Sequence, residues 1–329
     1  MMYDSFSLIH FQIIAAFILD ITIGDPQWRF HPVRLIGKSI HCLEYIVRRL
    51  PLPERLMGLF LTGGIVSGVY IITYEIMSFS KQWNPVCEAL TGGIIVYFAI
   101  SIKNLADEAK KVINMLRIND LKNARIMLSR IVGRDTADLN REQIIRAAIE
   151  TVAESCVDGI LAPLFYCFIG GPVAAMTYRA VNTLDSMVGY KSEKYIKLGW
   201  ASARLDDMAN YIPARLSALF IPAASFLCGY GFQNSLMTAF LEGRKHESLN
   251  SGIPEAAFAG ALGVQLGGPS TYEGEVVDKP SIGDNKKQIT LESLEMALRL
   301  MFVTSVLFLI SGLSFILMVR VLATTQHSQ

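Results

Sequence analysis

The 329-residue chain is 52% hydrophobic and 18% charged, with a mean hydropathy of +0.38, which is unusual for a soluble domain. Its formal net charge of +1 argues against a nucleic-acid partner, because neutralising the phosphates of a nucleic-acid backbone requires a strongly basic surface. The five cysteines form no CxxC pair and are odd in number, which argues against a thiolate metal site or a disulfide framework. The composition therefore favours a protein of the lipid bilayer.

Apolar windows of roughly membrane-spanning length, about 20 residues, recur along the chain. They are Ser7–Ile23, Leu56–Met77, Val86–Ile102, Gly159–Tyr178, Tyr211–Phe232 and Ala297–Val319. No positive segment precedes the first window and no small-residue cleavage site follows it, so we expect it to be retained. The predicted fold class is all-α: a multi-pass integral membrane protein with four to six membrane segments, some of them allowed to be re-entrant, and cytoplasmic helical loops.

The basic loops decide between topologies, since Lys and Arg favour the cytoplasmic side. If all six windows crossed the bilayer, the basic loop 179–210 would lie outside. Pro163 and the Gly170–Pro172 stretch interrupt one window, and Pro213 and Pro222 interrupt the next, so both segments can enter the membrane and return. This arrangement places all polar loops, including the candidate site, on the cytoplasmic face of the cell membrane. A plain six-crossing topology is the alternative.

The loop after the third window is predicted to be helical. The segment DLKNARIMLSRIVGRDT predicts an amphipathic helix that stops at Gly133. A second helix is predicted to start at Asn140, with Gln143 completing a capping box. The stretch 262–283 is rich in Gly and Pro and predicts an ordered loop.

These segments are predicted to form one membrane domain over residues 1–329. Its parts are N-terminal membrane segments (1–102), a cytoplasmic helical region (103–156), a motif-rich site region (157–290) and a C-terminal membrane helix (291–329).

One candidate site lies on the helix that begins near Asn140. Glu150, Glu154 and Asp158 are spaced at i, i+4 and i+8 and share a helical face, with Arg146 one turn earlier. Carboxylate oxygens are the ligands that Mg²⁺ prefers, and carboxylates at a membrane boundary are costly unless paired. A solvated stripe paired with arginines is the competing interpretation.

A second polar cluster follows the fourth window. NTLD provides Asn182 and Asp185, and DDMAN provides Asp206, Asp207 and Asn210. The surrounding basic residues are Arg179, Lys191, Arg204 and Arg215. Carboxylates that hold Mg²⁺ beside cations that neutralise phosphate are what phosphoryl chemistry requires. A salt-bridged loop is the alternative.

The segment GDPQWRFHPVRLIGKS carries Asp25, His31 and Arg34. Its GKS ending is not a Walker A loop, because Pro32 occupies the position that requires glycine. A single histidine next to a proline is more often structural than catalytic.

These motifs together resemble one known family. The segments GDPQWRFHPVRLIG, GRDT, ETVAESCVDGILAPL, GGPVAAMTYRAVNTLDSMVGYKSEKY, GWASARLDDMANYIPARL and NSGIPEAAFAGALGVQLGG occur in this order. They are similar to successive motifs of the CobD/CbiB family, the adenosylcobinamide-phosphate synthases of cobalamin biosynthesis. The resemblance extends from Asp20 to about Gly283.

The resemblance implies an integral-membrane carbon-nitrogen ligase. Its substrates would be adenosylcobyric acid and aminopropanol phosphate or a related aminoalcohol, with ATP as cosubstrate and Mg²⁺ as cofactor. Other membrane-associated cobalamin-assembly enzymes are possible partners. A corrinoid propionate must be activated before an amine can displace oxygen from it, and an acyl phosphate is the economical route.

Spacing and resemblance together give the predicted site. The catalytic candidates are Asp185, Asp206, Asp207, Glu150, Glu154 and Asp158. The substrate- and phosphate-binding candidates are Arg34, Arg134, Lys191, Arg204, Arg215, Asn182, Asn210 and His31. Mg²⁺ is assigned to Asp185, Asp206 and Asp207, and the resemblance adds Asp25 and Asp135 as further candidates. Both acidic clusters are predicted to build one site.

Two other functions compete with this one. The N-x-x-D and D-D-x-x-N pairs resemble half of the aspartate motifs of intramembrane prenyltransferases, which bind Mg-diphosphate but need about nine spans. A corrinoid transporter or regulatory membrane protein would use Asp185, Asp206 and Asp207 for a coupling ion, and broken membrane segments suit it.

Overall fold

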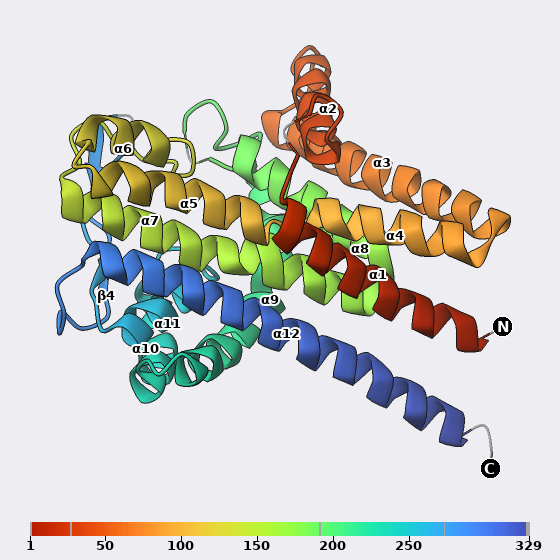
Figure 1. Cartoon of the computed structure of the whole chain (residues 1–329). Helices are drawn as coiled ribbons and strands as arrows, with labels where there is room; N and C mark the ends of the chain where they lie inside the picture. Colours follow the sequence, from red (N-terminus) through yellow and green to blue (C-terminus); the bar gives the residue numbers. More distant parts are fainter. Residues whose placement is uncertain (1, 27, 191, 273, 327–329) are drawn as a thin grey trace. The chain divides into compact units, whose positions relative to one another are not determined.

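The structure is a computed structural model that describes residues 2–26, 28–190, 192–272 and 274–326 (Figure 1). The regular structure of these residues is almost entirely helical, as predicted. The chain divides into two compact units that are both discontinuous in sequence. Unit 1 comprises Met1–Ser101, Ala162–Asn210 and Ile310–Gln329, and unit 2 comprises Ile102–Leu161 and Tyr211–Leu309. The single domain predicted over residues 1–329 stays a prediction.

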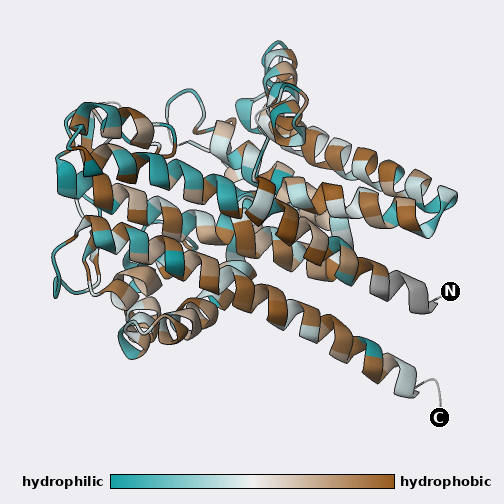
Figure 2. Cartoon of the chain, in the orientation of Figure 1, coloured by the Kyte–Doolittle hydropathy of each residue, from teal (hydrophilic) through white to brown (hydrophobic). Residues whose placement is uncertain are grey.

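Unit 1 is a bundle of apolar helices. Its members are α1 (Met2–Ile23), α2 (Pro32–Val47), α3 (Glu54–Trp83), α4 (Pro85–Ala99), α8 (Ala162–Val188), the first part of α9 (Trp200–Leu227) and the end of α12 (Leu291–Gln326). Helix α1 packs on α4, and α3 and α4 both pack on α8. Gly92 lets α4 approach α1 closely, because a Cβ there would collide with the side chain of Gln12. Apolar residues run along α3 and α4 (Figure 2).

Unit 2 combines helices with two small antiparallel ladders. Its helices are α5 (Ile102–Arg117), α6 (Leu121–Leu128), α7 (Arg141–Cys156), the π-helical turn η1 (Val157–Leu161), α10 (Phe232–Glu242), η2 (Gly243–Lys245) and α11 (Gly252–Leu262). Helix α11 packs on α10 and α7, and α5 also packs on α7. Strand β1 (Leu266–Gly267) pairs with β4 (Ser281–Ile282), and β2 (Ser270–Tyr272) pairs with β3 (Glu275–Val277). The predicted Gly- and Pro-rich loop therefore becomes a pair of short ladders.

Within the described residues, four helical runs are long and apolar enough to cross a membrane. They are Glu54–Trp83, Pro85–Arg117, Arg141–Val188 and Leu291–Thr325, and Leu8–Ile23 is a shorter apolar helix. These runs agree with the predicted all-α membrane architecture. The predicted window Tyr211–Phe232 is wrong as a single segment, because α9 ends at Leu227 and Phe232 already begins α10. A turn at Gly229, whose φ is +72°, separates the two helices.

The predicted helix interruptions have different outcomes. The main chain of α8 is non-helical at Gly170 and at Gly171, where φ is +67°, directly before Pro172. Only glycine tolerates that conformation readily, so this predicted break is confirmed. Pro213 and Pro222, by contrast, lie inside a continuous α9, and the expectation that they interrupt it is wrong. The fixed φ of proline is helical, so each ring removes a hydrogen bond without forcing the chain to turn.

Helix ends in unit 2 test two further predictions. The capping box at the start of α7 is confirmed, with Asn140 and Gln143 each bonding the other's main-chain N–H at 2.9 and 2.8 Å. Helix α6 ends at Leu128 and not at Gly133. The Oγ of Ser129 donates to the carbonyl of Ile126 at 2.9 Å, and such bonding to the preceding turn helps to end a helix before any glycine is reached.

Candidate functional site

Glu150 is an acidic residue of unit 2 whose two carboxylate oxygens are both hydrogen-bonded. It lies on α7 and is buried. The guanidinium of Arg134, from the loop before α7, donates to its Oε2, and the N–H of Gly267 on β1 donates to its Oε1 at 2.7 Å. Two donors from distant segments therefore fix the carboxylate, and the ion pair offsets much of the cost of burying it.

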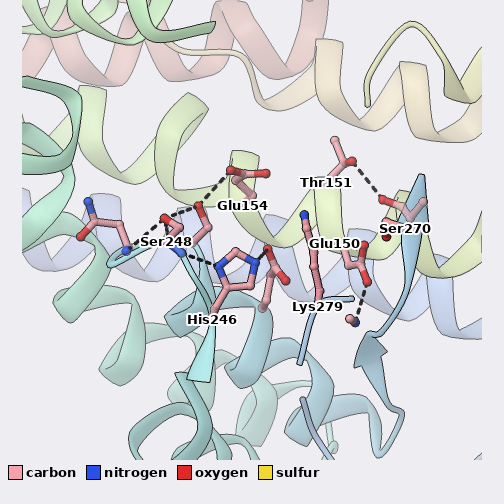
Figure 3. Close-up of polar contacts among 12 residues, drawn as sticks. Glu150, Thr151, Glu154, His246, Ser248, Ser270 and Lys279 are labelled. Atoms are coloured by element: carbon pink, nitrogen blue, oxygen red, sulfur yellow. Dashed lines mark hydrogen bonds and ion pairs between the residues drawn. The ribbon is translucent and has the colours of Figure 1, made fainter. Parts of the chain in front are cut away.

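Glu154 lies one helical turn further along α7 and is exposed. It accepts a hydrogen bond at 2.9 Å from the Oγ of Ser251, which precedes α11 (Figure 3). The same loop is bound from another direction, since Arg215 donates to Oδ1 of Asn250 at 2.6 Å. Glu154 thus lies one turn from buried Glu150 on the same face of α7 and contacts the 246–251 loop.

Partly buried His246 and buried Glu255 form a second pair beside these groups. Nδ1 of His246 accepts the N–H of Ser248 at 3.0 Å, so the hydrogen of the neutral ring lies on Nε2, which is 3.8 Å from Oε1 of Glu255. Burial and the nearby Glu150 and Glu154 raise the pKa of Glu255 well above its ordinary value. Burial and the charge of Lys279 lower the pKa of His246.

The electrostatics of this cluster follow from those shifts. The raised pKa of Glu255 favours its neutral acid and the lowered pKa of His246 favours its neutral ring, and the cations Arg134 and Lys279 lie near the same carboxylates. We call this group, Arg134, Glu150, Glu154, His246, Glu255 and Lys279, the unit 2 cluster. Figure 3 shows its labelled members meeting from α7, the 246–251 loop and the strand region.

Sequence reasoning did not single out His246, Glu255 or Lys279 as site residues. His246 has no ligand-like spacing to another histidine, and Lys279 lies in a stretch whose composition indicated only a loop. Asp158 lies in η1, where a π-helical turn changes the angular step between residues. The face predicted from α-helical spacing therefore holds for Glu150 and Glu154, and the role of Asp158 stays a prediction.

In unit 1, the two predicted motifs meet between α8 and α9. Tyr178 donates to Oδ1 of Asn210 at 2.8 Å, and Nδ2 of Asn210 donates to Oδ2 of Asp206 at 2.9 Å. Tyr166 stacks on Tyr178 and donates to the carbonyl of Ala209 at 3.0 Å. These bonds fix the rotation of α9, so that Asp206 points toward α8.

The carboxyl group of Asp206 is strongly perturbed by its surroundings. Burial and the neighbouring Asp185 raise its pKa to about 7, against the opposing effect of hydrogen bonds from Asn210 and Asn182. Its other oxygen, Oδ1, is buried and has no hydrogen-bond partner. The tertiary structure therefore brings together Asn182, Asp185, Asp206 and Asn210, the residues that the two motifs predicted. We call these four residues the unit 1 cluster.

The remaining predicted residues lie around these clusters or elsewhere. Asp207 pairs with exposed Arg204 at 3.7 Å. Lys191 lies outside the described residues. Arg215 belongs to unit 2, where its guanidinium also lies 3.6 Å from the ring centroid of Tyr211. Arg34 is exposed on α2.

The residues of the GDPQWRFHP segment form a contact of their own in unit 1. Nε2 of buried His31 lies 2.5 Å from Oδ1 of Asp25, and the ring meets Phe98 edge-on. Asp135, in unit 2, has a different environment. Its N–H donates to the carbonyl of Thr271 at 2.8 Å, and its Oδ2 accepts the N–H of Gly274 at 2.8 Å. These two bonds anchor the β2–β3 hairpin.

The predicted magnesium site can be compared with this geometry. Among the described residues, no three His, Cys, Asp or Glu side chains are grouped closely enough to hold a metal ion by themselves. Mg²⁺ is commonly bound through one or two carboxylates, with waters and substrate phosphates completing the octahedron. The unpartnered Oδ1 of Asp206 beside Asp185 fits that donor set. Metal binding there, and a single site built by both clusters, stay predictions.

Comparison with known proteins gives a consistent result. A model of the family described as "CobD/Cbib protein" matches residues 13–301. The chain is 42% identical over 311 residues to the cobalamin biosynthesis protein CobD of Pelobacter propionicus, covering 94% of this chain and 96% of the relative. It is 45% identical to CobD of Clostridium perfringens, covering 86% and 90%, and 45% identical to CbiB of Salmonella typhimurium, covering 89% and 93%. No solved structure matches.

The matched region contains every motif on which the resemblance was based, and it includes the residues of both clusters. The alignments cover most of this chain and most of each relative. The chain therefore belongs to the CobD/CbiB family of cobalamin biosynthesis proteins.

Proposed function

We propose that the protein is an ATP- and Mg²⁺-dependent carbon-nitrogen ligase of the cell membrane. It joins the amino group of aminopropanol, of its phosphate, or of a related aminoalcohol to the free propionate of adenosylcobyric acid. The product is adenosylcobinamide or its phosphate. Membership in a family whose relatives are named as cobalamin biosynthesis proteins supports the pathway, and the site chemistry supports the reaction class.

The reaction requires two balanced steps. A propionate oxygen attacks the γ-phosphorus of ATP, the bond to ADP breaks, and an acyl phosphate forms. The amine nitrogen then attacks the acyl carbon, the C–O bond to the phosphate breaks, and the amine loses a proton as the amide forms. Positioning and charge neutralisation dominate the barrier of the first step.

The unit 1 cluster is assigned to the phosphate end of the reaction. Asp206 and Asp185 would hold Mg²⁺, which neutralises phosphate oxygens when it is bound. Asn182 and Asn210 hold the Asp206 carboxylate in place by hydrogen bonds. Tyr178 orients Asn210 and so supports that geometry from α8.

The unit 2 cluster is assigned to the amine. Glu154 is exposed and one of its oxygens is held by Ser251, so its charge can attract the ammonium group of the incoming aminoalcohol. Arg134 and Gly267 keep Glu150 from competing for that ammonium, because both oxygens of Glu150 are already bonded. Glu154 therefore binds substrate, and Glu150 positions the strand beside it.

The observation that carries the proposal is the unpartnered Oδ1 of Asp206 beside Asp185. Two neighbouring carboxylates with an unbonded buried oxygen are stable only with a proton or a cation between them. A cation there is what a phosphoryl-transfer step needs.

The test is mass spectrometry of adenosylcobyric acid after incubation with purified protein, ATP, Mg²⁺ and candidate amines. We expect a mass increase equal to the amine minus water, with ADP and phosphate released in equal amounts. Transfer from a prenyl diphosphate without amide formation would contradict the ligase. Uptake of an unchanged corrinoid into proteoliposomes, again without amide formation, would support a transporter.

A further inference from the structure

A basic and aromatic surface lies on unit 1 and shares no residue with the unit 1 cluster. It consists of Tyr45, Arg48, Arg49, Arg55, Lys194, Tyr195, Lys197 and Trp200, which we call the basic-aromatic patch. The residues come from the end of α2, the α2–α3 connection and the first turn of α3, and from the loop before α9 together with the first residue of α9. We propose that this patch binds the headgroups of anionic phospholipids.

The two loops of the patch are joined by direct contacts. Arg48 donates to the carbonyl of Lys194 at 3.2 Å and lies over the ring of Tyr195 at 5.6 Å. The backbone of Leu198 lies so close to Gly58 of α3 that a Cβ at Gly58 would collide with its carbonyl oxygen. Residues about 150 positions apart therefore form one continuous surface on the same side of any membrane that α3 crosses.

The lysines of the patch are exposed to solvent and are only weakly paired with the neighbouring glutamates. Lys194 and Lys197 are 62% and 67% exposed, and each is 3.9 Å from a glutamate, Glu44 or Glu54. These distances exceed those of a hydrogen-bonded pair. Glu44 is buried and already bonded by Arg48 at 2.8 Å. The outward surface thus carries a surplus of positive charge.

Aromatic rings hold several of these cations in place. The guanidinium of Arg49 lies 4.0 Å from the ring centroid of Tyr45, that of Arg55 lies 5.7 Å from Trp200, and the ammonium of Lys194 lies 4.5 Å from Tyr195. Tyr and Trp favour the level of lipid headgroups, where one part of the ring is apolar and the other is wet. The combination is typical of a membrane interface.

The position of α3 gives the depth of the patch. Arg55 lies in the first turn of this candidate membrane helix, and exposed apolar Leu59 and Phe60 follow one turn later. At 1.5 Å per residue, Arg55 lies about 6 to 8 Å above that apolar surface, which corresponds to the headgroup layer. Juxtamembrane clusters of Lys and Arg at this level attract anionic lipids.

The opposite end of α3 provides an internal comparison. Trp83 is exposed there, next to the turn into α4, and Lys81 is the only Lys or Arg between residues 56 and 102. An exposed tryptophan or tyrosine is thus present near both ends of α3, but the surplus of basic residues is present only at the end that begins with Glu54. Selectivity for anionic lipid should follow the basic end.

Quenching of tryptophan fluorescence by brominated lipid tests the proposal. Two single-tryptophan variants of the full chain are reconstituted, one retaining Trp200 and one retaining Trp83, with the other tryptophans replaced by Phe. Vesicles contain brominated phosphatidylglycerol in unbrominated phosphatidylcholine, or the reverse labelling. We expect phosphatidylglycerol to be enriched at least threefold near Trp200 and not near Trp83, and the enrichment to fall at high salt.

Charge-reversal variants test whether the lipid enrichment depends on the basic residues of the patch or on contact with the membrane in general. Arg49→Glu combined with Lys197→Glu should abolish the enrichment at Trp200, whereas Lys110→Glu with Lys111→Glu, at exposed positions of α5, should leave it unchanged. Arg48 stays in place because it bonds buried Glu44. An unchanged melting temperature shows that the variants are folded.

Three outcomes would overturn the proposal: equal enrichment at Trp200 and Trp83, enrichment that survives the double reversal, or loss of enrichment on adding millimolar inorganic phosphate at constant ionic strength. The last result would show a site for free phosphate. None of these readouts depends on catalysis, so they stand apart from the proposed ligase activity.

Discussion

Nδ2 of Asn210 donates to Oδ2 of Asp206 at 2.9 Å, one turn earlier on α9, while Oδ1 of the same carboxylate is buried without a partner. The hydrogen bond from Asn210 fixes the side chain of Asp206, and the unpartnered Oδ1 leaves an oxygen to which a cation can bind. Replacing Asp206 by Asn removes the charge and keeps the shape. We expect amide formation to fall at least a hundredfold, or about 3 kcal/mol of transition-state stabilisation.

The measurement is the initial rate of adenosylcobinamide formation as a function of Mg²⁺ concentration. Asp107→Asn is the matched control, because that carboxylate lies exposed on α5 and pairs with Lys110 on the surface. A normal rate and a normal Mg²⁺ requirement in Asp206→Asn would remove the unit 1 cluster from the mechanism.

The raised pKa of Asp206 predicts a pH-dependent stability. Its folded-state pKa is about 7, whereas an unfolded Asp has a pKa of about 3.9, so the folded state binds more protons between these values. Its contribution is fully present below about pH 4 and is lost as the pH rises through 7. Asp185 and Asp207 face this group and contribute to the effect.

Thermal unfolding in detergent with EDTA, from pH 5 to pH 8, measures this contribution. Relative to the native chain, Asp206→Asn should become progressively more stable with rising pH, by an amount on the order of a few kcal/mol. Adding Mg²⁺ should reduce the difference, because a bound cation removes the repulsion. A difference that is independent of both pH and Mg²⁺ would contradict the predicted environment.

The buried pair of Arg134 and Glu150 should matter more than an exposed ion pair. Arg134→Ala leaves a buried carboxylate with only the N–H of Gly267, and we expect a loss of about 3 to 5 kcal/mol in the free energy of unfolding. Arg117→Ala breaks the exposed pair with Glu295 in the same unit and should cost about 0 to 1 kcal/mol. Urea or thermal unfolding compares the two, and equal losses would argue against the pair as a structural anchor.

Two glycines of α3 offer a steric test. Gly58→Ala places a methyl group against the main chain of Leu198, whereas the corresponding position at Gly68 faces open space. The first change should lower the free energy of unfolding by about 1 to 3 kcal/mol. The second should leave it unchanged or raise it by up to about 1 kcal/mol, because alanine favours the helix. Melting temperatures report both, and a tolerated Gly58→Ala would mean that the 192–199 loop packs differently.

The contact between Arg48 and Lys194 predicts a shared side of the membrane for their loops. Single cysteines at Ser39 and Ser192, in a chain without its native cysteines, should both resist an impermeant reagent added outside intact cells. Gln82, which lies next to the α3–α4 turn, should react. Labelling of Ser192 from outside would exclude a cytoplasmic position for this loop, and different labelling of Ser39 and Ser192 would exclude the contact.

Local patterns were sufficient for much of the architecture. The hydropathy windows identify α3, α4 and α12 because a membrane helix needs a continuous apolar run, which is a property of adjacent residues. The capping box at Asn140 and the break at Gly170–Pro172 are likewise encoded within a few positions. Each depends on main-chain chemistry that one segment determines by itself.

The wrong predictions, the end of α6 and the interruption of α9, came from residues that are compatible with more than one main-chain conformation. Gly133 can end a helix, but Ser129 already lies in a position to bond the preceding turn. Pro213 and Pro222 can interrupt a helix, but the conformation that proline imposes also fits inside one. Spacing alone does not decide which solution a packed chain adopts.

The sequence by itself determined the family, the helical membrane class and the pairing of Asn and Asp in two motifs of the unit 1 cluster. Only the tertiary structure placed Asp206 beside Asp185, gave Glu150 its two donors, and added His246, Glu255 and Lys279 to the unit 2 cluster. These relationships join segments far apart along the chain. A pKa or a buried hydrogen bond depends on distance in space, which no local pattern of residues specifies.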